Sequence, residues 1–172
     1  MKKVILIGYM AVGKTTIARL ISEKMSVKYL DLDKLIEEKT NLSIGELFKL
    51  KGEIYFRNIE HETFKYLMSN NENLVISTGG GTPCYANNHL FLNGKNFVSI
   101  YLRASLSVIL HRLTAEKKTR PLVANQSEEE LKEFVAKHIF ERSYFYNQAT
   151  FTVDVDNKTP EVITDEILKL LD

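Results

Sequence analysis

Short apolar segments alternate along the chain with segments in which apolar residues recur at helical spacing. The apolar segments are typical of buried strands and lie at 3–8, 28–30, 74–78, 97–102 and 151–155. The helical spacing predicts helices at 15–25, 34–69 with a break near Gly52, 106–113, 128–148 and 160–171. Strands that alternate with helices predict a parallel sheet covered on both faces, which is a three-layer α/β fold.

Composition narrows the class of protein. The chain has 172 residues, 44% of them hydrophobic, which is the length of one domain with enough apolar area for a core. A net charge of +1 argues against a nucleic-acid-binding arm, and the single cysteine, Cys84, excludes an internal disulfide. The first residues resemble a signal peptide but lack a cleavage site, and no apolar stretch is long enough to span a membrane. We therefore expect a cytoplasmic protein that binds neither nucleic acid nor membranes.

The first predicted strand and helix are joined by a phosphate-binding motif. Gly8, Gly13, Lys14 and Thr15 occupy the fixed positions of G-x-x-x-x-G-K-[ST]. Backbone N–H groups of such a loop surround an anion, while Lys14 can reach the β- and γ-phosphates and Thr15 can ligate Mg²⁺. A tight turn with a solvated lysine is the alternative, but the complete motif between a strand and a helix favours nucleotide binding. The short chain argues against a motor ATPase, and the lack of an Asn-Lys-x-Asp motif argues against a GTPase.

Two carboxylates follow the second predicted strand. Asp31 and Asp33 are two residues apart, so both side chains point to one side if the backbone is extended. Ligands of open α/β sheets gather at the carboxyl ends of the strands. One acid could therefore hold Mg²⁺ through water, and the other could accept a proton from the hydroxyl of a phosphoryl acceptor. Alternatively, Asp33 caps a helix that begins at Lys34.

Arginine is scarce, with six residues against 17 lysines, so we expect it where a planar guanidinium matters. Arg57 is followed at i+3 by Glu60, which could orient it, and Arg57 and Arg142 together could grip one carboxylate. For either arginine alone, a solvated helix residue is the alternative. Arg120 lies in a polar segment, about 114–126, that is typical of a mobile loop and could bring it over a transferring phosphoryl group.

Three consecutive glycines, Gly79, Gly80 and Gly81, follow the third predicted strand. Glycine is needed where the backbone approaches a ligand closely or adopts a positive φ, and a flexible turn is the alternative. The four histidines lack metal-ligand spacing, so we expect them to be structural or on the surface.

These motifs together resemble the shikimate kinase family, in order and over nearly the whole chain. The motifs are the phosphate loop, Asp31-Leu32-Asp33, Phe56-Arg57-x-x-Glu60, the glycine triplet, Arg120-Pro121-Leu122 and Arg142-x-x-x-Tyr146. The resemblance implies one P-loop kinase domain over 1–172, with a five-stranded parallel sheet of order 2-3-1-4-5. It also implies a substrate-binding subdomain at about 32–62 and a lid at about 114–126. The chain departs from the family pattern at Ala11, where glycine is frequent, and at Tyr144, where proline is common.

The resemblance further implies a reaction and a role for each site residue. A monomer with Mg²⁺ as cofactor would transfer the γ-phosphoryl group of ATP to the 3-hydroxyl of shikimate, on the pathway to chorismate and the aromatic amino acids. The catalytic residues would be Lys14, Asp33 as the base, and Arg120. ATP would be bound by Gly8, Ala11, Val12, Gly13, Lys14, Thr15, Thr16, Arg112, Arg120 and Pro160. Shikimate would be bound by Asp33, Ile44, Phe48, Phe56, Arg57, Gly79, Gly80, Gly81 and Arg142. The metal would be held by Thr15 and, through water, by Asp31.

Two other functions remain open on the sequence. A kinase of the same architecture could act on gluconate or on a nucleoside monophosphate, although a nucleotide acceptor would need more cationic contacts than six arginines provide. An ATP-binding regulatory module without transfer activity is the other, and the presence of both Asp33 and Arg57 argues against it.

Overall fold

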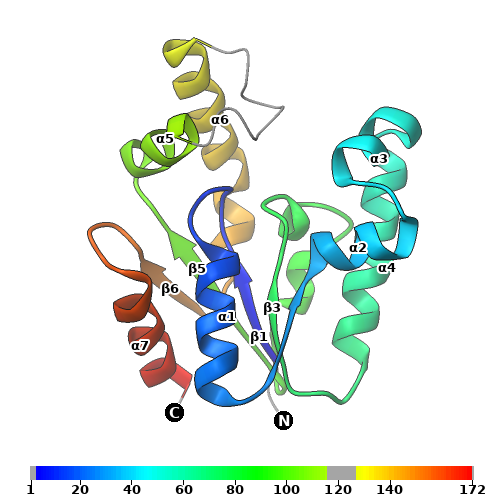
Figure 1. Cartoon of the computed structure of the whole chain (residues 1–172), viewed down its shortest axis with the longest axis vertical. Coiled ribbons are helices and arrows are strands. Elements are labelled where there is room, and N and C mark those ends of the chain that lie inside the picture. The colour runs from blue at the N-terminus through cyan, green and yellow to red at the C-terminus, as the bar shows by residue number, and fades with distance from the viewer. Residues whose placement is uncertain (1–2, 116–126, 172) are drawn as a thin grey trace.

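The computed structural model describes residues 3–115 and 127–171, and a central sheet organises them (Figure 1). Five strands are parallel and lie in the order β2-β3-β1-β5-β6, which is the predicted order of the five strands. Their bounds are β1 Lys3–Ile7, β2 Lys28–Asp31, β3 Leu74–Ser77, β5 Phe97–Arg103 and β6 Phe151–Asp154. The sequence did not predict β4 (Asn93–Gly94), which pairs antiparallel with the beginning of β5.

Helices cover both faces of the sheet. They are α1 Lys14–Met25, α2 Leu32–Thr40, α3 Ile44–Lys51, α4 Glu53–Ser69, α5 Leu106–Ala115, α6 Glu128–Tyr146 and α7 Pro160–Leu171, with 3₁₀ turns η1 Thr82–Cys84 and η2 Asn88–Phe91. The chain has two hydrophobic cores, one on each face of the sheet, and alternate residues of β1 belong to different cores. Val4 and Leu6 pack with α1, α5, α6 and α7, whereas Ile5 and Ile7 pack with α2, α3 and α4. The prediction of a three-layer α/β fold is therefore correct.

The segment between β2 and β3 contains one more break than expected. The pattern predicts a helix over 34–69 interrupted near Gly52, but the chain also leaves the helix at Asn41, whose φ is +54°. Ser43 then begins α3 with a capping box, in which its side chain accepts from the backbone N–H of Glu46 and Glu46 accepts from the N–H of Ser43. Three helices, α2, α3 and α4, thus lie between β2 and β3 in the chain; α3 is at the upper right of Figure 1, and α4 runs from there down beside the sheet.

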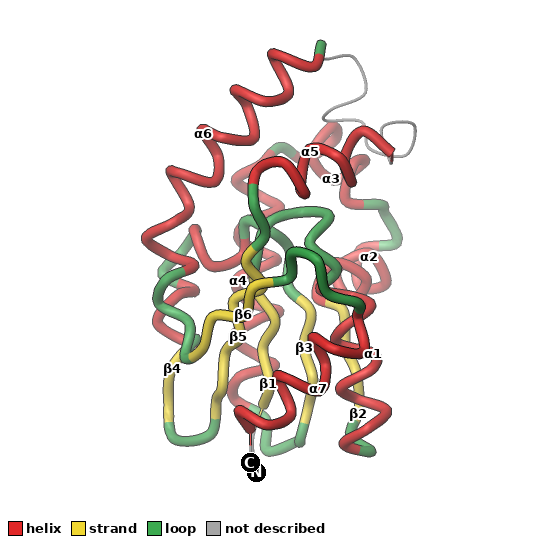
Figure 2. The backbone as a smooth tube through the Cα atoms, turned by 90° about the vertical axis from the view of Figure 1, so that its left-hand side faces the viewer, coloured by secondary structure: helices red, strands yellow, loops and turns green. Residues whose placement is uncertain are grey.

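The loops that follow the parallel strands gather at one end of the sheet, as Figure 2 shows. This is the expected location of a ligand site in a parallel α/β sheet. Among the helices of the described residues, none combines the length and apolar character that crossing a bilayer requires.

Candidate active site

The loop between β1 and α1 has the conformation that its glycines allow. Gly8 has a φ of +142°, and a Cβ there would lie 2.6 Å from the carbonyl oxygen of Leu102. Gly13 has a φ of +100° and directly precedes the first residue of α1. Ala11 lies in the left-handed region with a φ of +64°, which an L-amino acid rarely adopts. The alanine therefore occupies a conformation that favours glycine.

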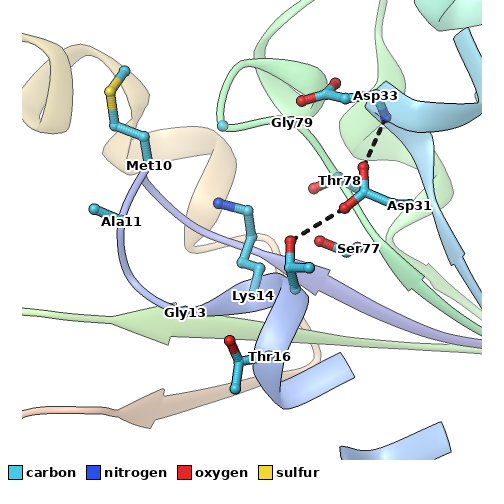
Figure 3. A pocket seen from close by; sticks show the side chains of 12 residues that line it. Met10, Ala11, Gly13, Lys14, Thr16, Asp31, Asp33, Ser77, Thr78 and Gly79 are labelled. Carbon is cyan, nitrogen blue, oxygen red and sulfur yellow. Dashed lines mark hydrogen bonds between the residues drawn. The ribbon is translucent and has the colours of Figure 1, made fainter. Parts of the chain in front are cut away.

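A cleft of about 370 Å³ lies between this loop and the carboxyl ends of β2 and β3 (Figure 3). It is lined by Met10, Ala11, Gly13, Lys14, Thr15, Thr16, Asp31, Asp33, Ser77, Thr78, Gly79 and Gly80. The ammonium group of Lys14 donates to the carbonyl oxygens of Gly8 at 2.9 Å and Tyr9 at 2.8 Å. The cleft thus combines a helix N-terminus, a buried lysine and two carboxylates, which is a setting for a phosphate ester with a cation.

Asp31 is held by donors from three elements. Its Oδ2 accepts from the Thr15 hydroxyl at 3.1 Å and from the Tyr29 hydroxyl at 3.0 Å. Its Oδ1 accepts from the backbone N–H groups of Asp33 and Lys34. Asp31 is therefore the N-cap of α2, and the interpretation of Asp33 as the cap is wrong. The carboxyl group of Asp33 remains available to the cleft, which it lines.

Asp33 is a weaker acid than usual. Burial is the largest cause and the neighbouring charge of Asp31 the next, and the pKa of Asp33 is raised to about 6. The nearby Lys14 acts in the opposite direction and limits the rise of this pKa. A carboxyl group that titrates near pH 6 is suited to accept a proton at neutral pH.

The glycine triplet is where the remaining charged groups meet. A Cβ on Gly79 would lie 3.0 Å from Oδ1 of Asp33, and one on Gly80 would lie 3.5 Å from Nη1 of Arg142. A Cβ on Gly81 would collide with Arg57, whose Nη2 would be only 2.8 Å away. None of the three has a positive φ, so backbone conformation does not require glycine here. Close approach favours glycine at positions 79 and 81, whereas a Cβ at position 80 would be in ordinary contact with its neighbours.

Both candidate clamp arginines are fixed by polar and aromatic neighbours. Nη1 of Arg57 donates to Oε2 of Glu60 at 2.7 Å, as the i+3 spacing suggested, and Glu60 is only 1% exposed. Arg142 lies over the ring of Tyr9, with 5.5 Å between its Cζ and the ring centroid. Beside Arg142, the hydroxyl of Tyr146 donates to the carbonyl oxygen of Gly80 at 2.6 Å. Neither arginine is a freely solvated helix residue, and both reach the same glycine triplet.

Of the predicted apolar wall, Phe56 belongs to the hydrophobic core that contains Ile5 and Ile7. The rings of Phe48 and Phe56 lie 4.6 Å apart between centroids, with Phe48 37% exposed and Phe56 3%. Ile44 is half-buried against the same cluster. Phe48 on α3 and Phe56 on α4 lie beside Arg57, whose Cζ is 6.0 and 5.0 Å from their ring centroids. Ile44 is the first residue of α3.

Arg112 lies on the other side of the phosphate loop. Its Nη1 donates to the carbonyl oxygens of Ala11 at 3.2 Å and Val12 at 3.1 Å. It also lines a cavity of about 530 Å³ with His111 and residues of the β6–α7 loop, namely 157–159, just before Pro160 begins α7. Arg120 and residues 116–126 of the predicted lid lie outside the described residues.

Several contacts in the site were missed by the sequence reasoning. The hydroxyl of Tyr29 donates to Asp31, two residues further along β2. Residues i and i+2 of a strand lie on the same face, so the sequence pattern could have indicated this contact. Thr82 donates to Oε1 of Glu60 at 2.6 Å, and Tyr146 appeared only as part of a motif. The contacts of Thr82 and Tyr146 join residues far apart in the chain, so no local pattern indicates them.

Comparison with known proteins gives one consistent result. A family model described as shikimate kinase matches residues 10–172. The shikimate kinase of Flavobacterium johnsoniae is 52% identical over 171 residues, covering 99% of each chain, and that of Flavobacterium psychrophilum is 47% identical with the same coverage. The crystal structure of shikimate kinase from Bacteroides thetaiotaomicron superposes with a TM-score of 0.91 at 33% identity, covering 99% of this chain and 98% of that one. The Acinetobacter baumannii shikimate kinase in complex with shikimate gives a TM-score of 0.87 at 30% identity, covering 99% and 93%.

Proposed function

The chain belongs to the shikimate kinase family, and from that premise we propose how its residues transfer the γ-phosphoryl group of ATP to the 3-hydroxyl of shikimate. The product, shikimate 3-phosphate, leads to chorismate and the aromatic amino acids. One observation carries the assignment of residues: Asp33, Arg57 and Arg142 meet at a glycine triplet that faces the phosphate loop.

The nucleotide is assigned to the loop of Gly8 to Thr16. Its β- and γ-phosphates would lie against the backbone N–H groups and the ammonium of Lys14, where the N-terminus of α1 adds positive potential. The cavity beside Arg112 and Pro160 is the proposed location of adenine, because it opens directly behind the loop that Arg112 binds. Arg120 is assigned to the transferring phosphoryl group by the family resemblance.

Thr15 and Asp31 fit a magnesium ion. Hydroxyl and carboxylate oxygens are the ligands that Mg²⁺ prefers, and these two lie 3.1 Å apart. Within residues 3–115 and 127–171, no three His, Cys, Asp or Glu side chains form a metal site by themselves. The remaining ligands would therefore be waters and nucleotide phosphates. When bound, Mg²⁺ neutralises charge on the β- and γ-phosphates.

The acceptor is assigned to the opposite side of the cleft. Arg57 and Arg142 would hold the shikimate carboxylate, since planar guanidinium groups match a carboxylate in geometry and charge. The backbone of Gly79 to Gly81 would approach the ring, with Ile44, Phe48 and Phe56 as its apolar wall. This assigns 32–62 as the substrate-binding subdomain of one domain, and about 114–126 as its lid.

Asp33 is assigned as the base. Its carboxylate takes the proton of the 3-hydroxyl as the hydroxyl oxygen attacks the γ-phosphorus, the bond to the bridging β–γ oxygen breaks, and ADP leaves. The pKa of about 6 keeps Asp33 ionised at neutral pH while leaving it basic enough to accept this proton. Positioning of the two substrates and charge neutralisation by Lys14 would supply most of the remaining acceleration.

A coupled assay of ADP release tests this function. Shikimate, gluconate and nucleoside monophosphates are compared as acceptors with Mg²⁺ and ATP. Separately, we propose that the protein is a monomer, which size-exclusion chromatography tests. We expect turnover with shikimate only. Equal or faster ADP release with gluconate or a nucleotide would contradict the assignment of shikimate as the acceptor.

A further inference from the structure

The guanidinium of Arg57 rests on an aromatic ring that no motif indicates. Its Cζ lies 3.9 Å from the ring centroid of Tyr85, the shortest cation–ring distance in the described part of the chain. Phe56 and Phe48 are further away, at 5.0 and 6.0 Å from the same Cζ. A cation this close to a ring face is attracted by the negative face of the π-system.

The loop that carries Tyr85 is fixed from within. Asn88, which is fully buried, donates its backbone N–H to the carbonyl oxygen of Tyr85 and its side-chain amide to that of Thr82, both at 2.9 Å. Its Oδ1 lies 2.7 Å from Nδ1 of His61 on α4. The loop is thus hydrogen-bonded to α4, which is the helix that carries Arg57. The ring of Tyr85 and the guanidinium of Arg57 are therefore held in a fixed relative position.

The ring supplies a constraint that the acids around Arg57 do not. Glu60 accepts from Nη1 at 2.7 Å and Glu53 from Nε at 3.4 Å, and both act along the edge of the guanidinium. Tyr85 acts on its face and so sets the tilt of its plane. A carboxylate must meet that plane edge-on to form two parallel hydrogen bonds. Unlike a further carboxylate, the neutral ring fixes the group without offsetting its charge.

Tyr85 also stands close to the second arginine. Together with Arg142, Cys84 and His138 it lines a cavity of about 230 Å³. Its side chain is 38% exposed, so its replacement leaves no buried cavity in the core. The residue therefore faces both members of the proposed clamp while contributing little to folding.

We propose that Tyr85 is a positioning residue for the phosphoryl acceptor: its ring face sets the plane of Arg57 and thereby the fit of the acceptor carboxylate. The proposal rests on the role of Arg57 given above. It predicts that the aromatic face matters and that the phenolic hydroxyl does not.

The test compares Tyr85→Phe with Tyr85→Leu. We expect Tyr85→Phe to keep the KM for shikimate within about twofold, and Tyr85→Leu to raise it by about 3- to 30-fold, the range between exposed and desolvated cation–π contacts. The KM for ATP should stay unchanged in both, because the ring does not line the phosphate cleft. Tyr66→Leu, the same change nine residues after Arg57 on α4 and 69% exposed, is the control and should leave both constants at wild-type values.

A second comparison isolates the arginine. In an Arg57→Gln background, Tyr85→Leu should no longer change the KM for shikimate, because there is no cation left to orient. Equal KM values for Tyr85→Leu and wild type, equal effects of Phe and Leu, or a Leu effect that persists with Gln at position 57 would each overturn the proposal. Failure of the wild-type protein to phosphorylate shikimate would instead overturn the proposed function, so the two failures are distinguishable.

Discussion

The surroundings of Asp33 disfavour its ionised form, so this residue makes the free energy of unfolding depend on pH. Its pKa is about 6 in the folded chain and 3.8 in its ordinary state. Between these values the folded state binds more protons than the unfolded state, so the free energy of unfolding falls as pH rises from about 4 to about 6. Above pH 6 the full cost of the buried charge is present.

Asp33→Asn should therefore stabilise the protein at neutral pH. We expect the free energy of unfolding to rise by about 3 kcal/mol at pH 7.5, and this gain to disappear near pH 4, where the wild-type carboxyl is neutral. Urea denaturation at several pH values measures this. Asp154→Asn is a control of opposite sign, because the ion pair with Arg103 lowers the pKa of Asp154. A pH-independent effect of Asp33→Asn would contradict the raised pKa.

The same substitution should separate binding from chemistry. If Asp33 is the base, Asp33→Asn lowers kcat by at least about 100-fold, because an amide cannot accept the proton of the hydroxyl. The dissociation constant for ATP should change little, since the amide is close in size and the phosphate loop is untouched. Single-turnover kinetics and equilibrium titration with an ATP analogue measure the two quantities. Wild-type turnover would remove Asp33 from the mechanism.

At the scale of elements, α4 depends on a cation from another part of the fold. Its last turn contains no basic residue, but Lys3 on β1 donates to the carbonyl oxygens of Met68, at 3.3 Å, and Asn70. Lys3 is only 4% exposed, and it lies at the opposite end of β1 from the phosphate loop. A lysine that binds the last carbonyls of a helix stabilises the end of that helix.

Lys3→Met should test this contact. The substitution retains the aliphatic stem but leaves the buried carbonyl group of Met68 and the part-buried one of Asn70 without this donor, so we expect a loss of about 1–3 kcal/mol in the free energy of unfolding. Lys65→Met, an exposed position on α4, should change it by less than about 0.5 kcal/mol. Equal effects of the two substitutions in urea denaturation would show that Lys3 does not support the helix end.

The elements that the sequence predicted are those with a repeating pattern. The five parallel strands and the ends of α1 and α7 follow from hydrophobic periodicity and lie within one or two residues of the expected bounds. The break at Asn41 was missed, although Ser43 and Glu46 form a readable capping-box pattern. Residues 82–96 gave no prediction, because their turns depend on distant partners such as the side chain of Asn88.

At the scale of the whole molecule, the site is assembled from segments that meet only in the folded chain. The phosphate loop was predictable because one local motif contains all its parts. The meeting of Asp33, Arg57 and Arg142 at the glycine triplet was inferred from a family resemblance, since no spacing in the chain encodes it. The support of Arg57 by Tyr85 could not be inferred in either way, because Tyr85 belongs to no motif and approaches from an irregular loop.

Binding at such an assembled site should stabilise the whole fold. Shikimate at about 100 times its dissociation constant should add about 2.7 kcal/mol to the free energy of unfolding, because it binds only the folded chain. Arg57→Ala should abolish this increase, as the carboxylate loses a charged partner. Thermal denaturation with and without shikimate measures both. An undiminished rise in Tm for the variant would count against the clamp.

Lys14 gives the phosphate loop a property of its own. In this structure its ammonium group is bound to two carbonyl oxygens of the loop that it belongs to. On the proposed assignment of the nucleotide to this loop, its phosphates compete with these two carbonyl groups for the ammonium group, so binding exchanges hydrogen bonds rather than simply adding them. In the proposed release of ADP the exchange is reversed, because the ammonium group of Lys14 can again donate to the carbonyl oxygens of Gly8 and Tyr9. On the proposed assignment of the nucleotide to this loop, we expect this competition to weaken the binding of ADP and so to favour its release.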